Sequence, residues 1–354
     1  MSAATATVGT PGTSRPLRWP WIAFGSFLVM AAIGMWLVAL NDESLAEQVP
    51  YVVAFAMFGA VGALIASRDR GNTIGVLLLW TSCVTAFSFI SGEVITYALE
   101  HGSDGWWLVP IGFLNNFGWL FGVLPSLFLL PLLFPDGHLP SRRWRPYLWF
   151  IFVFLVLLAF SLMLGQRTLT GSGDLGIDNP LYVEAVGNLP NLDPVIALVF
   201  PAMVATSIAS LIVRFRRSAG VERQQIKWVA FGLLVSLVGI TLTSFGSEET
   251  LLSALVGGTA FLLFPLSIGI AVLRFHLYDL DVVVRKTVVY AAIALFATAV
   301  YLALVVGLGA WLGRGSSFLT MVAAVLVAVT FQPIRTWFTR FANRLVYGKR
   351  ATPY

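Results

Sequence analysis

Charged residues are scarce in this 354-residue chain: they make up only 11% of it, whereas hydrophobic residues make up 58%. A soluble globular domain carries roughly 25% charged residues, so the composition excludes that class as well as intrinsic disorder. The single cysteine, Cys83, excludes a disulfide scaffold. The three histidines lie far apart in the sequence, which does not match the clustered ligands of a metal site. We therefore expect neither a metal nor another cofactor.

Long apolar runs dominate instead, and a helix needs roughly 20 such residues to cross the hydrocarbon core of a bilayer. The runs are continuous rather than alternating, which favours helices over strands. The sequence therefore predicts an all-α polytopic membrane protein with residues 1–18 as a polar tail and residues 19–334 as a bundle. The ten predicted spans are 19–40, 50–67, 73–99, 108–134, 147–165, 194–213, 228–245, 251–273, 287–312 and 317–334.

The positive charge is distributed unevenly between the two sides of these spans. When both termini are placed in the cytoplasm, 20 of the 22 Lys and Arg residues fall inside, and only Arg167 and Arg314 fall outside. The positive-inside rule therefore predicts a multi-pass protein of the cytoplasmic membrane with both termini in the cytoplasm. Because the cations lie at membrane edges, the expected partner is the lipid bilayer and not a nucleic acid.

Polar side chains inside the spans are the usual functional signal in a membrane protein. In the predicted spans the one ionisable side chain is Glu93 in the third span, and Asn115 and Asn116 form an amide pair in the fourth. All three lie roughly 10 Å below the predicted outer surface, so a bond from Glu93 to one of the amides is expected. Either these residues form an outward-facing pocket that binds a ligand or titrates, or they only hold two helices together.

The lack of other intramembrane charges bears on the class of function. Ion-coupled transporters need titratable or coordinating groups near the midplane, and hydrolases need a nucleophile–base pair or metal ligands. The spans between 147 and 334 carry no Asp, Glu, Lys, Arg or His within their cores. The scarcity of such groups argues against both classes. A transporter or permease-like subunit is therefore kept only as the second interpretation of the function, and a membrane enzyme as the third.

The segment after Pro333 has a different character. Its apolar residues fall on one helical face and its arginines on the flanks, as in a helix that lies at the cytoplasmic interface. We expect residues 335–354 to form this amphipathic juxtamembrane helix and the start of a linker that leads to a cytoplasmic partner.

Several stretches together resemble the membrane-embedded N-terminal region of polytopic bacterial two-component sensor histidine kinases. Mild departures are Thr73, Val76 and His138, which stand where Pro, an aromatic and a basic residue are common. The matching stretches are 62–68 with 72–75, 133–140 with 142–144, 214–217 with 220–228, 273–285 with 289–290, and 331–335 with 343–348.

The resemblance implies a sensory, signal-transducing module that acts through a cytoplasmic kinase or response-regulator pathway, or as a homodimer. It does not extend to a phosphoacceptor or ATP-binding domain, so no catalytic residue is carried over and no enzyme activity is expected from this chain. Charged inner connectors would link the signal to the cytoplasm. The candidate signal-linking residues are Glu222, Arg223, Lys227, Asp279, Asp281, Arg285 and Arg335, with Glu222 expected to pair with Arg223 or Lys227.

Overall fold

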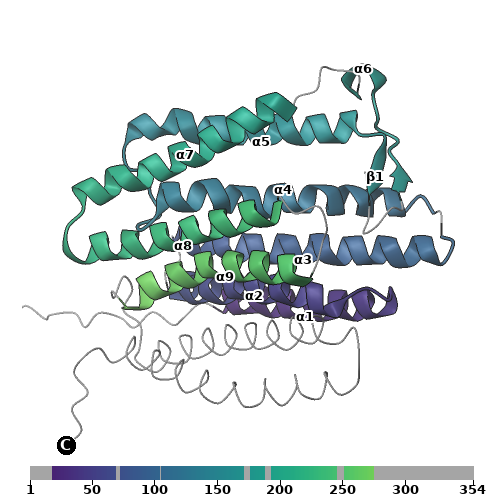
Figure 1. The fold of residues 1–354 in the computed structure, drawn as a ribbon, viewed down its shortest axis with the longest axis horizontal. Coiled ribbons are helices and arrows are strands. Elements are labelled where there is room, and N and C mark those ends of the chain that lie inside the picture. The colour runs from purple at the N-terminus through teal and green to yellow at the C-terminus, as the bar shows by residue number, and fades with distance from the viewer. Residues whose placement is uncertain are drawn as a thin grey trace, which may run out of the picture.

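The computed structural model describes residues 18–68, 72–103, 105–170, 176–187, 193–244 and 251–274, and within them the chain is a helical bundle (Figure 1). The long helices are α1 (Trp19–Leu40), α2 (Leu45–Arg68), α3 (Thr73–Glu100), α4 (Leu108–Leu133), α5 (Arg145–Gly165), α7 (Asp193–Arg217), α8 (Gly220–Ser244) and α9 (Leu251–Arg274). A 3-10 turn, η1 (Arg142–Trp144), precedes α5, and a short helix, α6 (Glu184–Gly187), precedes α7.

Eight helices of this part of the chain are long and apolar enough to cross a membrane. They coincide with the first eight predicted spans, which confirms a helical membrane protein. The predicted spans 287–312 and 317–334 and the amphipathic segment 335–354 lie outside the described residues, as does the N-terminal tail apart from residue 18. Several helices run past their apolar stretch: α8 begins at Gly220 rather than 228, because a helical backbone continues into its charged end.

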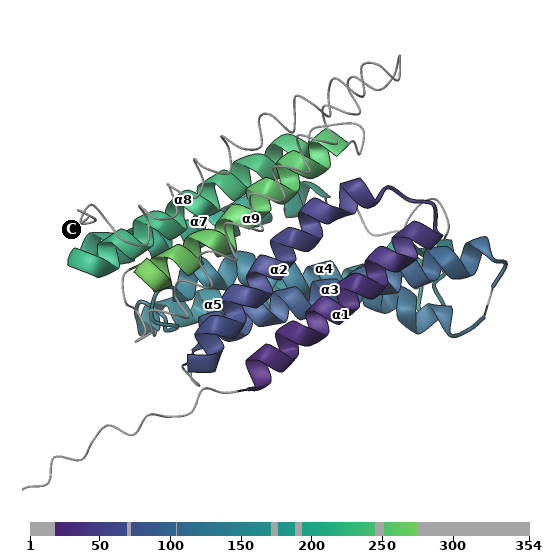
Figure 2. The same cartoon turned by 90° about the horizontal axis from the view of Figure 1, so that it is seen from below.

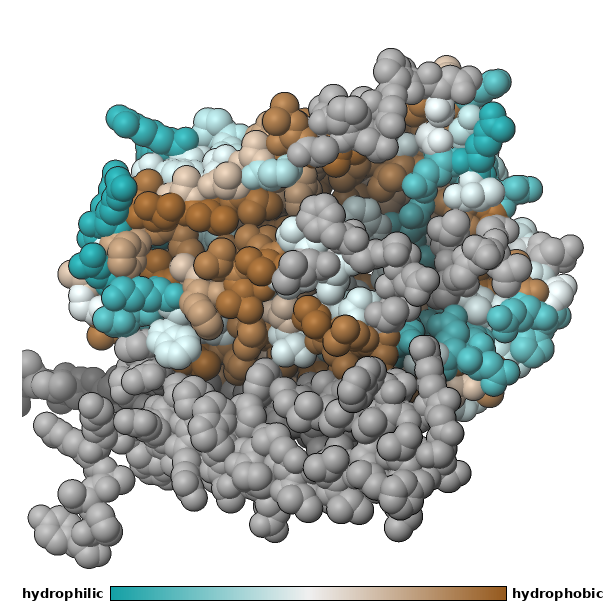
Figure 3. All heavy atoms as spheres, in the orientation of Figure 1, coloured by the Kyte–Doolittle hydropathy of each residue, from teal (hydrophilic) through white to brown (hydrophobic). Residues whose placement is uncertain are grey.

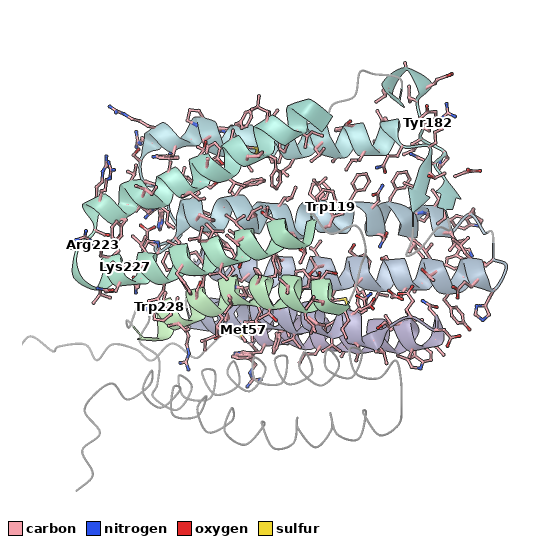
Figure 4. All side chains as sticks on the ribbon, in the orientation of Figure 1. Met57, Trp119, Tyr182, Arg223, Lys227 and Trp228 are labelled. Carbon is pink, nitrogen blue, oxygen red and sulfur yellow. The ribbon has the colours of Figure 1, made fainter. Side chains whose placement is uncertain are left out.

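The bundle has two hydrophilic ends and an apolar middle. Figure 3 shows hydrophobic side chains gathered between two rims of hydrophilic ones. Arg223 and Lys227 lie at one end and Tyr182 at the other (Figure 4). We call the end that carries the connections α4–α5 and α7–α8 the basic end, and the opposite one the hairpin end. This distribution matches a bilayer with polar surfaces on both sides.

The helices pack in a defined order. α9 lies between α8 and α2, and α2 lies between α9 and α1 (Figure 2). Large aromatic side chains fill the α2–α9 contact, where the Phe58 ring stacks on Phe261 with centroids 5.2 Å apart. α3 contacts α1, α2 and α4, so it connects the helices on its two sides.

α2 and α3 approach each other closely at a point where a glycine stands on each side. A Cβ on Gly62 would lie 2.7 Å from the Leu79 nitrogen, and one on Gly75 would lie 2.7 Å from the Ala66 nitrogen. Small residues allow such backbone contact in membrane bundles. Asn72 caps the start of α3, because its side-chain oxygen accepts from the Gly75 N–H at 3.1 Å.

We predict that Gly62→Ala lowers the free energy of unfolding by about 1 kcal/mol, because backbone atoms of α3 must move away. Gly25→Ala is the matched control, since a Cβ there meets no atom within 4 Å. Unfolding in detergent mixtures measures both. Equal effects of the two substitutions would contradict the close-packing account.

The segment between α5 and α7 contains the one departure from an all-α chain in the described residues. Strands β1 (Thr168–Thr170) and β2 (Gly176–Asp178) pair antiparallel, with Thr168 opposite Asp178. The buried Leu169 of this hairpin lies over Gly112 of α4. Beside it, the hydrogen bond to Tyr182 raises the pKa of the Arg167 guanidinium. The loop therefore forms a small folded cap at this end of the bundle.

Candidate functional site

Two charged side chains are buried in the described part of the chain, and they lie at opposite ends of the bundle. Glu93 of α3 is 1% exposed, towards the hairpin end, and Arg214 of α7 is 8% exposed, at the basic end. A charge removed from water is costly unless it is paired and hydrogen-bonded. The partners of these two residues therefore define the candidate functional regions.

Glu93 ties α3 to the end of α1. The side-chain amide of Asn41, the residue that follows α1, donates to the Glu93 carboxylate at 3.0 Å and to the Glu93 main-chain oxygen at 3.1 Å. Asn41 is 6% exposed, and its own side-chain oxygen has no hydrogen-bond partner among the described residues. Asp42 follows with φ of 54° and turns the chain towards α2. This contact thus holds the α1–α2 turn against α3.

The two predicted amides of α4 do not share one site with this contact. Asn115 donates to the Ser88 carbonyl at 3.1 Å and accepts at its own main-chain oxygen from the Ser88 hydroxyl at 2.9 Å. Ser88 lies five residues before Glu93, about 7.5 Å along α3. Asn116 donates to Gln166 at 2.7 Å. The expected amide partner of Glu93 was therefore wrong, because the sequence does not give the register of α3 against α4.

We predict that Asn41→Ala lowers the free energy of unfolding by about 1 kcal/mol, because it removes the amide that bonds the Glu93 carboxylate and the Glu93 main-chain oxygen. Glu93→Gln, which keeps an acceptor oxygen of the same shape, should cost less than half of that. The free energy of unfolding of the two purified variants measures the difference. A larger loss for Glu93→Gln would mean that the charge, and not the hydrogen bond, holds this contact together.

Arg214 joins the C-terminal part of α7 to the connection between α4 and α5. Its guanidinium donates to the Asp136 carboxylate at 2.9 Å and to the main-chain oxygen of His138. Arg214 is buried, whereas the Asp136 side chain is 56% exposed. The guanidinium of this ion pair is therefore shielded by the protein while the carboxylate contacts water, so solvent screens the pair only in part.

The chain around Asp136 is folded to present this carboxylate. The Asp136 side chain also accepts from the His138 N–H at 3.1 Å, which closes an Asx-type turn. Gly137 within that turn has φ of 76°, a conformation that side chains with a Cβ rarely adopt. The turn places the Asp136 oxygen and the His138 carbonyl on the same guanidinium.

This contact brings together two of the stretches on which the family resemblance rests, 133–140 and 214–217. Two more of these stretches, 62–68 and 72–75, form the glycine contact between α2 and α3 and the Asn72 cap of α3. In this chain these stretches therefore build helix junctions at the basic end. Their spacing in sequence gave no sign of the Asp136–Arg214 bond, because it joins residues 78 positions apart.

The described candidate signal-linking residues lie at the start of α8 and are exposed. Arg223 packs its guanidinium over the Phe215 ring at 4.6 Å. Within the described residues, Glu222 forms no ion pair with Arg223 or Lys227. That expectation was wrong, because residues one or five positions apart do not face each other on a helix. Asp279, Asp281, Arg285 and Arg335 lie outside the described residues.

Within the described part of the chain, no group of three or more His, Cys, Asp or Glu residues is placed to hold a metal ion. Comparison with known proteins found no matching family model, curated protein or solved structure. The fold and the positions of the polar residues define only a class: a helical, membrane-embedded protein with one buried ionisable side chain near each end of its bundle.

Proposed function

We propose that this protein is a sensory, signal-transducing module of the cytoplasmic membrane, which passes a change at the hairpin end to its basic end. The observation that carries the proposal is the placement of the two buried ionisable side chains, Glu93 and Arg214. Each fixes a connection between helices at one end, Asn41–Glu93 for α1–α2 and Asp136–Arg214 for α4–α5. A bundle held by two discrete contacts can change between discrete arrangements, which is what a sensor requires.

α3 and α4 provide a continuous physical path between these contacts. α3 carries Glu93, and polar bonds fasten it to α4 along the interface: Ser88 to Asn115, and the Thr81 hydroxyl to the Gly122 carbonyl at 2.8 Å. α4 then leads directly into the turn at Asp136 that holds α7. A shift of α3 at Glu93 would therefore move α4 and change the distance between Asp136 and Arg214.

The proposal places the basic end in the cytoplasm, following the positive-inside rule. Single cysteines at His101 and His138, in a Cys83→Ser background, test this orientation in intact cells. Both side chains are exposed and lie at opposite ends. A membrane-impermeant maleimide should label position 101 in intact cells and position 138 only after permeabilisation. The reverse pattern would invert the proposed direction of signalling.

Hydrogen exchange in lipid nanodiscs tests the transmission itself. Asn41→Ala removes the amide that bonds Glu93 and should increase amide exchange in residues 133–140 and 214–219 by at least about five-fold, which corresponds to about 1 kcal/mol. Glu100→Ala is the control, because it truncates an exposed polar side chain at the same end of the bundle. Exchange that changes only around residues 41 and 93 would contradict a signal-transducing role.

A further inference from the structure

Helix α5 is the least buried of the eight candidate spans. Large apolar side chains cover its exposed side: Trp149, Phe150, Phe152, Val153, Leu157 and Phe160 are all between 48% and 66% exposed. Arg145, Trp149, Phe152 and Phe160 share one stripe about 80° wide at 100° per residue. From Arg145 to Phe160 this stripe is about 22 Å long, more than half the thickness of the hydrocarbon core.

A cluster of three arginines stands at the basic end of this stripe. Arg142, Arg143 and Arg145 are exposed, and none forms an ion pair with another described residue. The first turn of α5 contains no acidic residue. Trp144 lies beside them, and amphipathic rings of this kind are favoured at the headgroup level. The cluster therefore offers positive charge without an internal counter-charge where a bilayer has its phosphates.

We propose that α5 binds an anionic phospholipid, with its headgroup on Arg142, Arg143 and Arg145 and an acyl chain along the Trp149–Phe160 stripe. Charge complementarity favours an anionic headgroup over a zwitterionic one. The apolar part favours a lipid over a second transmembrane helix. Helix pairs in membranes approach through Gly, Ala or Ser, whereas the exposed apolar side chains of this stripe are Trp and Phe.

Native mass spectrometry of the full chain in detergent tests the proposal with phosphatidylglycerol and phosphatidylcholine of identical acyl chains. Each arginine near a headgroup changes affinity about five-fold, so we expect at least about a ten-fold preference for phosphatidylglycerol. The triple variant R142Q/R143Q/R145Q should lose this preference. The matched triple R216Q/R217Q/R223Q, which removes the same charge from exposed positions at the same end, should keep it. Circular dichroism checks that all forms remain helical.

Two further measurements separate the headgroup from the chain. W149A/F152A should weaken both lipids to a similar extent and leave their ratio unchanged. Glycerol phosphate, which has no acyl chain, should not displace the lipid at millimolar concentration. Equal binding of the two lipids, equal losses in both triple variants, or displacement by glycerol phosphate would each overturn the proposal.

Discussion

Asp136→Asn should lower the free energy of unfolding by about 2 kcal/mol. It removes the carboxylate charge from Arg214, which is only 8% exposed, but keeps the side-chain oxygen that accepts from the His138 N–H. Breaking a fully buried pair costs about 3–5 kcal/mol, and an exposed pair is worth about 0–1. The 56% exposure of the Asp136 side chain places this pair between those limits.

Unfolding of the purified protein by dodecyl sulfate in mixed micelles measures this loss. Glu222→Gln is the control, because it removes an acid at the same end that makes no ion pair in the described residues. In an Arg214→Met background, Asp136→Asn should cost less than about 0.5 kcal/mol, since no buried charge remains to be left unpaired. A cost of about 2 kcal/mol in both backgrounds would mean that Asp136 acts through its turn and not through Arg214.

Trp80→Phe should destabilise the protein by about 1.5 kcal/mol, because it removes the hydrogen bond to a carbonyl of α4 that a proline has left without its helical partner. Pro125 has no N–H, so the carbonyl four residues earlier, that of Phe121, loses its intrahelical partner. The Trp80 indole N–H donates to that carbonyl at 2.7 Å. Water is absent from the bilayer core, so an unpaired carbonyl there is expensive.

The companion variant Pro125→Ala makes this prediction specific. It restores an N–H for the Phe121 carbonyl, so Trp80→Phe should cost less than about 0.5 kcal/mol in that background. Trp36→Phe is the matched control, an indole removed from a side chain that is 61% exposed. The same titration in dodecyl sulfate measures all four proteins. An unchanged cost in the Pro125→Ala background would rule out this role for Trp80.

Trp80 also shows what the sequence could and could not predict. Each apolar run is long enough to identify a span by itself, so eight helices were predicted where the structure has them. Pro125 marks a freed carbonyl, but which side chain reaches it depends on the rotation of α3 against α4. Hydrophobicity does not determine that rotation, because lipid accepts any apolar face.

For the candidate site, too, the sequence predicted one residue but not its partner. Glu93 stood out because it is an acid inside a span, and the structure buries it. Its partner Asn41 follows the last residue of α1, where a polar residue is ordinary, so nothing in the sequence distinguished it. Arg214 belongs to a run of cations expected to lie at a membrane edge. Its burial appears only when α4 and α7 are packed together.

A double-mutant cycle between the two ends tests the central claim most directly. Asn41→Ala and Asp136→Asn are predicted to cost about 1 and about 2 kcal/mol alone. If the contacts belong to one coupled bundle, the double variant should deviate from the sum by about 1 kcal/mol, because opening one contact already relaxes the other. Additivity within about 0.5 kcal/mol would show that the ends act independently and would contradict a signal passing between them.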